Sequence, residues 1–373
     1  MAQTLIPAEL LKKSDKILFI AHLALGDFTY LQNFFQAFAR ANPHLKVHLW
    51  VDEVRRTSDA AQWPHLQKYA LYDWVAACPF FDKIYTRTYS PALYQESILE
   101  AQQEHYPIVV SLATLRPHLY AALARSISPD GLVVGMTKPV KFYQPHHRLA
   151  YRKLDAAIPP YSVDRSNPQH ISDVYAHWFH QISGLEVGTA ERFPFVDIPP
   201  QWQQYAQEKL VAWGFRTADA ADGDVSKLVF INPYAKTKKR CWPLEHVAGL
   251  IAAMQKQDKW RNSHFIVNAV PQELAHARSV IGGYRLERTE LFSAEDNFFQ
   301  LPAILAQCDL IISVETAVMH LANAVHVPVI ALMRQKNPEW VPIDRANSTV
   351  ITAPNRGDWV KAVTVEQVLK ATQ

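Results

Sequence analysis

The chain has 373 residues, 49% of them hydrophobic and 20% charged, so it can bury a large core and is long enough for two domains of ordinary size. Its formal net charge of +3 is too small to indicate a nucleic-acid partner. The three cysteines lie far apart without CxxC spacing, which argues against a disulfide framework and favours a reducing compartment, by default the cytoplasm. No segment approaches the roughly 18 apolar residues of a membrane-spanning helix, so any membrane contact is expected to be peripheral.

The first half of the chain alternates short apolar runs with segments whose apolar residues recur at helical spacing. The runs are rich in β-branched residues, which is typical of buried parallel strands. This alternation predicts a doubly wound parallel sheet. Strands are expected at residues 16–21, 46–51, 108–112 and 132–134, and helices at 27–41, 93–104, 117–125 and 171–183.

Between residues 137 and 167 the periodic pattern fades and prolines gather, so we expect a long functional loop there rather than core. Pro194, Pro199 and Pro200 mark the expected interdomain linker. An N-terminal domain is therefore predicted at residues 1–193.

A second alternating series follows the linker and predicts a second domain of the same architecture at residues 201–355. A C-terminal segment, 356–373, is expected to form a helix that could pack back on the N-terminal domain. The two domains are expected to face a central cleft with the carboxyl ends of their strands. Strands are expected at 228–232, 264–268, 310–314, 328–333 and 349–352, and helices at 202–213, 244–257, 272–281, 316–324 and 359–372.

Asp27 is the candidate catalytic residue. It follows the first predicted strand and Gly26, which permits a tight turn, so its carboxylate is expected to project into the cleft. Such a carboxylate can act as a general base when a hydroxyl comes within hydrogen-bond reach. The alternative is an aspartate that only caps its helix. Sequence position does not decide between them.

Two segments of the second half are candidates for binding a diphosphate. Residues 236–240, KTKKR, place four cations between a strand and a helix, although a solvated loop is the common explanation of such a run. Glu315 and Thr316 lie at a predicted strand-to-helix junction, where free N–H groups and the helix dipole favour an anion. His320 is one turn further on the same face. Here the alternative is an N-cap threonine and a core histidine.

The proline-rich region carries a run of bases without an intervening acid. They could hold an anionic acceptor or an anionic membrane surface, or they could belong to a mobile solvated loop. The bases are Lys138, Lys141, His146, His147, Arg148, Arg152 and Lys153.

No metal is expected. Asp222 and Asp224 match the DxD spelling of metal-bound sugar nucleotides, but their polar surroundings favour a surface turn. His177 and His180 share a helix face without a nearby third ligand.

Three segments of the chain together resemble glycosyltransferase family 9, the bacterial heptosyltransferases of the lipopolysaccharide inner core. They are LALGDF at 23–28, INPYAKTKKRCWPLEHVAGLI at 231–251 and SVETAVMHLANAVHVPVIAL at 313–332. The resemblance implies a GT-B fold of two Rossmann-like domains, the first binding mainly the acceptor and the second mainly the sugar nucleotide. It also implies transfer of heptose from ADP-heptose with inversion and without a metal.

Carried over by position, the resemblance makes Asp27 the catalytic base and assigns a donor site. Arg240 stands where a Lys is usual, Glu315 where an Asp is usual and Ala317 where a Gly is usual. At position 240, the planar guanidinium of Arg would replace the point charge of Lys. The longer carboxylate of Glu315 would reach a different sugar hydroxyl or shift the donor, and the methyl group of Ala317 would lie where the backbone should approach the phosphate closely. The predicted donor site comprises Lys236, Thr237, Lys239, Arg240, Glu315, Thr316, Ala317 and His320, and the predicted acceptor site Lys138, Lys141, His146 and Arg148.

The sequence thus predicts an inverting, metal-independent glycosyltransferase without a cofactor. Its expected partners are a nucleotide sugar and an anionic glycan or glycolipid acceptor, with peripheral contact at the cytoplasmic face of the inner membrane as an option. Two alternatives remain. One is a sugar-nucleotide epimerase of the same fold, and the other is a degenerate protein that binds a nucleotide sugar or glycan without turnover. A dehydrogenase is disfavoured because GxGxxG is missing.

Overall fold

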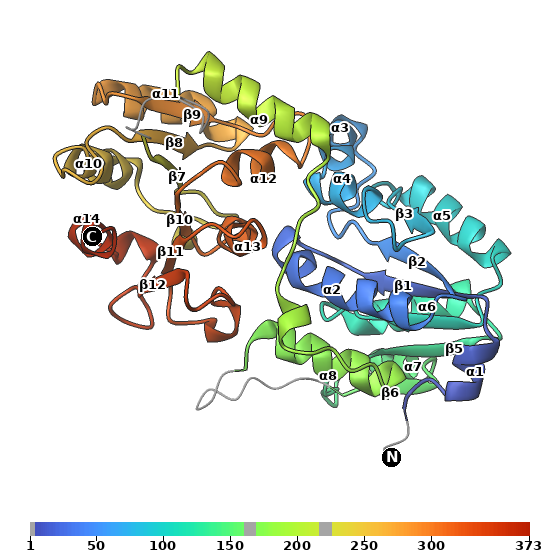
Figure 1. The fold of residues 1–373 in the computed structure, drawn as a ribbon. Helices are drawn as coiled ribbons and strands as arrows, with labels where there is room; N and C mark the ends of the chain where they lie inside the picture. Colours follow the sequence, from blue (N-terminus) through green and yellow to red (C-terminus); the bar gives the residue numbers. More distant parts are fainter. Residues whose placement is uncertain (1–3, 160–168, 216–225) are drawn as a thin grey trace. The chain divides into compact units, whose positions relative to one another are not determined.

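A computed structural model describes residues 4–159, 169–215 and 226–373 of the chain. The chain divides into two compact units, Met1–Arg192 and Phe193–Gln373, called unit 1 and unit 2 below (Figure 1). The DxD spelling at 222–224 lies outside the described residues. Within them, no helix combines the length and the apolar composition needed to cross a bilayer.

Unit 1 is built on a six-stranded parallel sheet with strand order β3-β2-β1-β4-β5-β6. The first strand, β1, lies in the middle of the sheet, β2 and β3 extend it in one direction, and β4, β5 and β6 extend it in the other. β1 and β4 therefore flank the point where strand order reverses. The central strands are buried on both faces, as the unbroken apolar runs require. The strands are β1 (Lys16–Ala21), β2 (Lys46–Val51), β3 (Lys83–Tyr85), β4 (Ile108–Ser111), β5 (Leu132–Met136) and β6 (Ala156–Ile158).

Helices cover both faces of this sheet (Figure 1). A cluster of fully buried phenylalanines joins β1 to two of them, α2 and α8. The Phe179 ring lies 5.8 Å from that of Phe19 and 5.7 Å from that of Phe35. The helices are α1 (Ala8–Lys13), α2 (Leu25–Ala41), α3 (Trp63–Gln67), α4 (Ala70–Ala76), α5 (Pro91–Gln103), α6 (Pro117–Ile127), α7 (Pro145–Tyr151) and α8 (Ile171–Ser183).

Unit 2 repeats the topology of unit 1. Its sheet order, β12-β11-β10-β7-β8-β9, is the same sequence of crossovers, with β7 and β10 flanking the reversal. All of its strand pairs are parallel. The strands are β7 (Leu228–Asn232), β8 (His264–Asn268), β9 (Thr289–Phe292), β10 (Leu310–Val314), β11 (Val329–Met333) and β12 (Ser348–Thr352).

The C-terminal helix packs within unit 2, against α10. Val360, Val363 and Val368 belong to the apolar core of this unit. The indole Nε1 of Trp242 donates a 2.9 Å hydrogen bond to the carbonyl of Val363. The helices are α9 (Pro200–Ala212), α10 (Leu244–Met254), α11 (Leu274–Gly283), α12 (Gln300–Leu305), α13 (Ala317–Ala324) and α14 (Val365–Ala371).

The expected loop at residues 137–167 was wrong in part, because it contains α7 and the edge strand β6. β6 pairs with β5, and its Ile158 is fully buried. β3 and β9, also at sheet edges, were not predicted. Strands of three or four residues are too short to show a periodic pattern, and their pairing to a neighbour stabilises them.

Phe179→Ala is expected to lower the free energy of unfolding by about 3–5 kcal/mol, because it leaves a cavity among packed aromatic rings. Phe142→Ala is the matched control, since that ring is 88% exposed and its loss should cost less than about 0.5 kcal/mol. Chemical denaturation of both variants measures the difference. Equal stabilities would contradict the described packing of α8.

Candidate functional site

The predicted base and the predicted donor-site residues follow strands at or beside the order reversal of each sheet. In unit 1, Asp27 follows β1. In unit 2, Arg240 follows β7, and Glu315 follows β10 directly. Ligands of open parallel sheets bind outside the carboxyl ends of the strands at this reversal, so each unit carries its candidates where its topology favours binding.

Asp27 lies in the first turn of α2 and is partly exposed. Its Oδ2 accepts a hydrogen bond from the backbone N–H of Ala24 at 3.1 Å, which satisfies a free donor at the helix start. Its Oδ1 accepts a 3.3 Å hydrogen bond from the hydroxyl of Tyr175 on α8. The carboxylate therefore does cap its helix, and one oxygen also faces a tyrosine from another element.

The surroundings of Asp27 raise the pKa of its carboxyl group above the usual value. Dense packing around the carboxylate, which disfavours its charged form, is the main cause, and the hydrogen bonds from Ala24 and Tyr175 act in the opposite direction. A carboxylate with a raised pKa is a stronger base than an ordinary aspartate. Sequence reasoning missed Tyr175, because its position in a helical pattern carries no sign that it meets Asp27.

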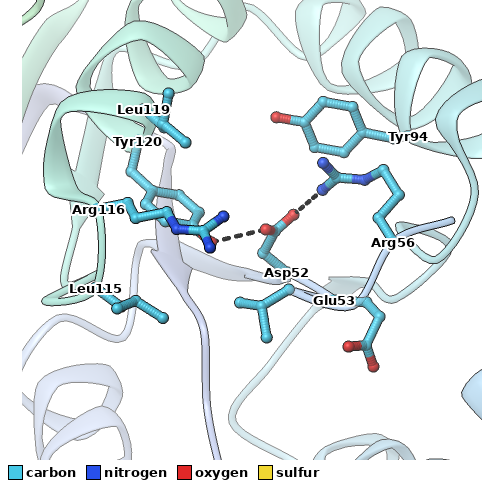
Figure 2. Close-up of a pocket in the computed structure, with 9 residues that line it drawn as sticks. Asp52, Glu53, Arg56, Tyr94, Leu115, Arg116, Leu119 and Tyr120 are labelled. Carbon is cyan, nitrogen blue, oxygen red and sulfur yellow. Dashed lines mark hydrogen bonds and ion pairs between the residues drawn. The ribbon is translucent and has the colours of Figure 1, made fainter.

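A second feature of unit 1 that the sequence did not reveal is a polar pocket beside β2 (Figure 2). Asp52 forms an ion pair with Arg56 at 2.5 Å and accepts a 2.7 Å hydrogen bond from the hydroxyl of Tyr120. The Arg56 guanidinium lies 3.4 Å from the centre of the Tyr94 ring. Arg116, exposed on the wall of the pocket, has φ of 53°, a conformation rarely adopted outside glycine. Strained backbone of this kind often marks a functional position.

The four predicted acceptor residues lie in the turn after β5 and on α7, and all are exposed. Lys138 lines a mostly apolar pocket together with Thr137 and Trp178, whose indole nitrogen is buried without a hydrogen-bond partner. His146 lies 6.2 Å from His118 on α6, ring centre to ring centre. The structure therefore gathers these bases on one segment of unit 1.

The basic loop of unit 2 presents most of its predicted side chains to solvent. Lys236, Thr237 and Lys239 are exposed, and residues 238–240 form a short 3₁₀ helix. Arg240 differs, because its Nε lies 3.5 Å from the Glu315 carboxylate and its side chain is only 36% exposed. This loop can present a group of cations at the carboxyl end of β7.

Glu315 is buried, with a side chain that is 2% exposed, and its carboxylate is engaged within unit 2. Arg334, which follows β11, forms an ion pair with it at 3.1 Å, and Asn337 donates a 2.7 Å hydrogen bond to it. Together with Arg240, two guanidinium groups share one carboxylate. The cluster keeps one positive charge in excess, which suits an anion.

Thr316 occupies the N-cap position of α13, but its side chain makes no capping hydrogen bond. Thr316 and Ala317 are both partly exposed, so the start of the helix is accessible. His320 is 2% exposed, and its ring centre lies 5.8 Å from that of Trp340. The helix start can thus receive an anion, with a buried histidine one turn away.

Sequence analysis missed Arg334, Asn337 and Trp340, although each lies after β11 and so at the same edge as Glu315. It also missed a buried amide pair under this edge, in which Asn268 donates a 2.8 Å hydrogen bond to Asn232. Position after a strand was the signal that could have pointed to these residues. Among the described residues, no group of three or more His, Cys, Asp or Glu has the arrangement of a metal site.

Replacing Tyr175 with Phe is expected to raise the pKa of Asp27 further, because the hydroxyl that stabilises the charged form is lost. Any activity that needs the ionised carboxylate should fall as the pH is lowered, and in the variant this fall should begin at a higher pH than in the wild type. NMR titration of the carboxyl carbons measures the change, with exposed Tyr143→Phe as control. A pKa that stays the same or falls would contradict the contact.

Glu315→Gln should destabilise the protein by about 3 kcal/mol, because it leaves Arg334, whose side chain is only 10% exposed, without its counter-charge. The control is Glu96→Gln, which breaks an exposed ion pair with Arg87 and should cost less than about 1 kcal/mol. Urea unfolding compares the two. Similar losses for both would show that the Glu315 cluster does not stabilise unit 2.

The family model for glycosyltransferase family 9 (heptosyltransferase) matches residues 159–368. No curated protein matches the chain. A family 9 glycosyl transferase structure from Veillonella parvula DSM 2008 is similar with a TM-score of 0.72 and 18% identity, over 98% of this chain and 97% of that chain. The structure of E. coli ADP-heptose lps heptosyltransferase II is similar with a TM-score of 0.65 and 13% identity, over 96% of this chain and 97% of that chain. The structure of E. coli heptosyltransferase WaaC with ADP has a TM-score of 0.60 and 17% identity, over 95% of this chain and 96% of that chain.

These neighbours and the two six-stranded parallel sheets confirm the predicted two-domain α/β fold of the GT-B type. The family match covers more than half of the chain. The chain therefore belongs to glycosyltransferase family 9, the heptosyltransferase family, and is a glycosyltransferase.

Proposed function

We propose that this glycosyltransferase transfers heptose from ADP-heptose to a lipopolysaccharide-core or related anionic glycan, with inversion and without a metal. The observation that carries the proposal is Asp27, a carboxylate of raised pKa that follows the first strand of unit 1. Support for the donor comes from the E. coli enzyme whose structures hold ADP and ADP-2-deoxy-2-fluoro heptose.

In this reaction Asp27 acts as general base. It takes the proton of an acceptor hydroxyl while that oxygen forms a bond to the anomeric carbon of the donor. The bond from the anomeric carbon to the diphosphate breaks in the same step, and its electron pair leaves with ADP. A single displacement inverts the anomeric centre. The Tyr175 hydroxyl holds the carboxylate in one orientation.

The residues of unit 2 would stabilise the departing diphosphate. Lys236, Thr237, Lys239 and Arg240 provide cations and donors, and the accessible start of α13 at Thr316 and Ala317 provides backbone N–H groups. Stabilising charge that develops on a leaving group is often the largest contribution to catalysis. Glu315 is bonded to Arg334, so we assign it the role of orienting guanidinium groups, and His320 remains the candidate for the sugar.

The bases of unit 1 would hold an anionic acceptor. Lys138, Lys141, His146 and Arg148 are exposed on one segment, and Arg116 adds a further cation near Asp52.

We place the reaction in the cytoplasm, because all three cysteines are free thiols, as a reducing compartment favours.

Asp27→Asn tests the proposal, because asparagine keeps the size of the side chain and cannot accept the proton. Release of ADP from ADP-heptose, with heptose-deficient lipopolysaccharide core as acceptor, should slow by at least about 100-fold. The rise in melting temperature caused by ADP should persist. Asp15→Asn, at an exposed aspartate of the same unit, is the control and should keep full activity.

Near-normal turnover by Asp27→Asn would remove the assigned base. A wild-type chain that is stabilised by ADP-heptose yet releases no ADP with any acceptor would indicate a binding protein instead. Conversion of the donor sugar without acceptor would indicate an epimerase.

A further inference from the structure

The turn before α7 exposes large apolar side chains to solvent. Phe142 is 88% exposed and Tyr143 is 57% exposed, while Leu149 on α7 itself is 60% exposed. Burying one side chain of this size is worth about 1.5–3 kcal/mol, so leaving several in water on one short segment is unfavourable unless something covers them. The segment therefore has the apolar component of an interaction surface.

The same segment is strongly basic. Residues 131–154 include five Lys or Arg and no Asp or Glu. All five are exposed, and among the described residues none of them forms an ion pair. They are Lys138, Lys141, Arg148, Arg152 and Lys153. This set and the three apolar side chains are called the 138–153 surface below.

We propose that the 138–153 surface docks unit 1 on an anionic lipid bilayer. Aromatic side chains settle at the level of the lipid headgroups, and Lys and Arg pair with anionic headgroups at the same depth. A soluble polyanion would use the cations, but it would leave Phe142 and Tyr143 in water. A bilayer satisfies both components, so it is the partner that the surface fits.

The 138–153 surface lies at the same edge of the sheet as Asp27. β5 leads directly into it, and β1 leads to Asp27. Since the strands are parallel, both segments lie at the carboxyl edge of the same sheet. Helix α6 packs against α7, and Leu119 on α6 is 52% exposed, while Leu115, two residues before the start of α6, is 47% exposed. Docking would bring this edge to a membrane, where a lipid-linked acceptor resides. The inference deepens the proposed function and rests on it for this benefit, because Lys138, Lys141 and Arg148 also belong to the proposed acceptor site. The binding test below needs neither donor nor acceptor.

Sedimentation of the full chain with vesicles tests the inference, without donor or acceptor. The chain should bind vesicles of phosphatidylcholine containing about one third phosphatidylglycerol, bind pure phosphatidylcholine weakly, and release as salt is raised. The double variant Phe142→Ser, Tyr143→Ser should reduce the partition coefficient at least about tenfold. Arg152→Gln with Lys153→Gln should reduce it about thirtyfold, because each cation near the surface contributes about fivefold.

The matched control is Val211→Ser with Tyr284→Ser, which removes side chains that are 63% and 48% exposed in unit 2 and should leave binding unchanged. Absence of binding to anionic vesicles would overturn the inference. A second result would also overturn it. If the Phe142→Ser, Tyr143→Ser variant binds anionic vesicles as well as the wild type does, and dextran sulfate abolishes vesicle binding equally in the variant and the wild type, the surface recognises a soluble polyanion. Turnover with a soluble acceptor reports on the proposed reaction separately, so failure of one does not imply failure of the other.

Discussion

Parallel strand pairing is the constraint on which the rest of the structure depends. In a parallel sheet every strand ends at the same edge, so segments far apart in the sequence must gather there. In unit 2 this places the segments after β7, β10 and β11 side by side, because these strands are consecutive neighbours in the sheet. Arg240, Glu315 and Arg334 meet for this reason.

The Glu315 cluster places a buried acid at the edge of unit 2 where we propose that a diphosphate binds. A carboxylate would repel a diphosphate, but here its charge is matched by two guanidinium groups. A buried carboxylate requires such partners, since an uncompensated charge in the interior is unstable. Arg240 and Glu315, which both depart from the family pattern, lie in contact, with the Arg240 Nε 3.5 Å from the carboxylate.

Asp27 caps its helix, and this contact is compatible with the role of general base that we propose for it. The hydrogen bond to Ala24 satisfies the start of α2, and the partly exposed carboxylate still carries a raised pKa. The cap restricts the orientation of the side chain, and restricted orientation is what a general base needs. In the same unit, the carboxyl edge continues into an exposed basic and aromatic segment, so the proposed base and the proposed docking surface lie at one edge of the sheet.

The sequence by itself determined most strands of the two sheets, the longer helices, the basic loop at 236–240 and the place of Asp27 after the first strand. These are local properties, since periodicity of two or 3.6 residues and the order of elements are written in neighbouring residues. The family could also be predicted from the sequence, because each of the three segments that resemble it is a continuous run of residues.

Only the tertiary structure decided the partners of these residues. Tyr175 reaches Asp27 across 148 positions, and Arg334 reaches Glu315 across 19. The raised pKa of Asp27 depends on atoms from several elements, and the edge strands β3, β6 and β9 exist because a neighbouring strand offers hydrogen bonds. Such contacts arise when distant segments pack together, and no local pattern of residues encodes that distance.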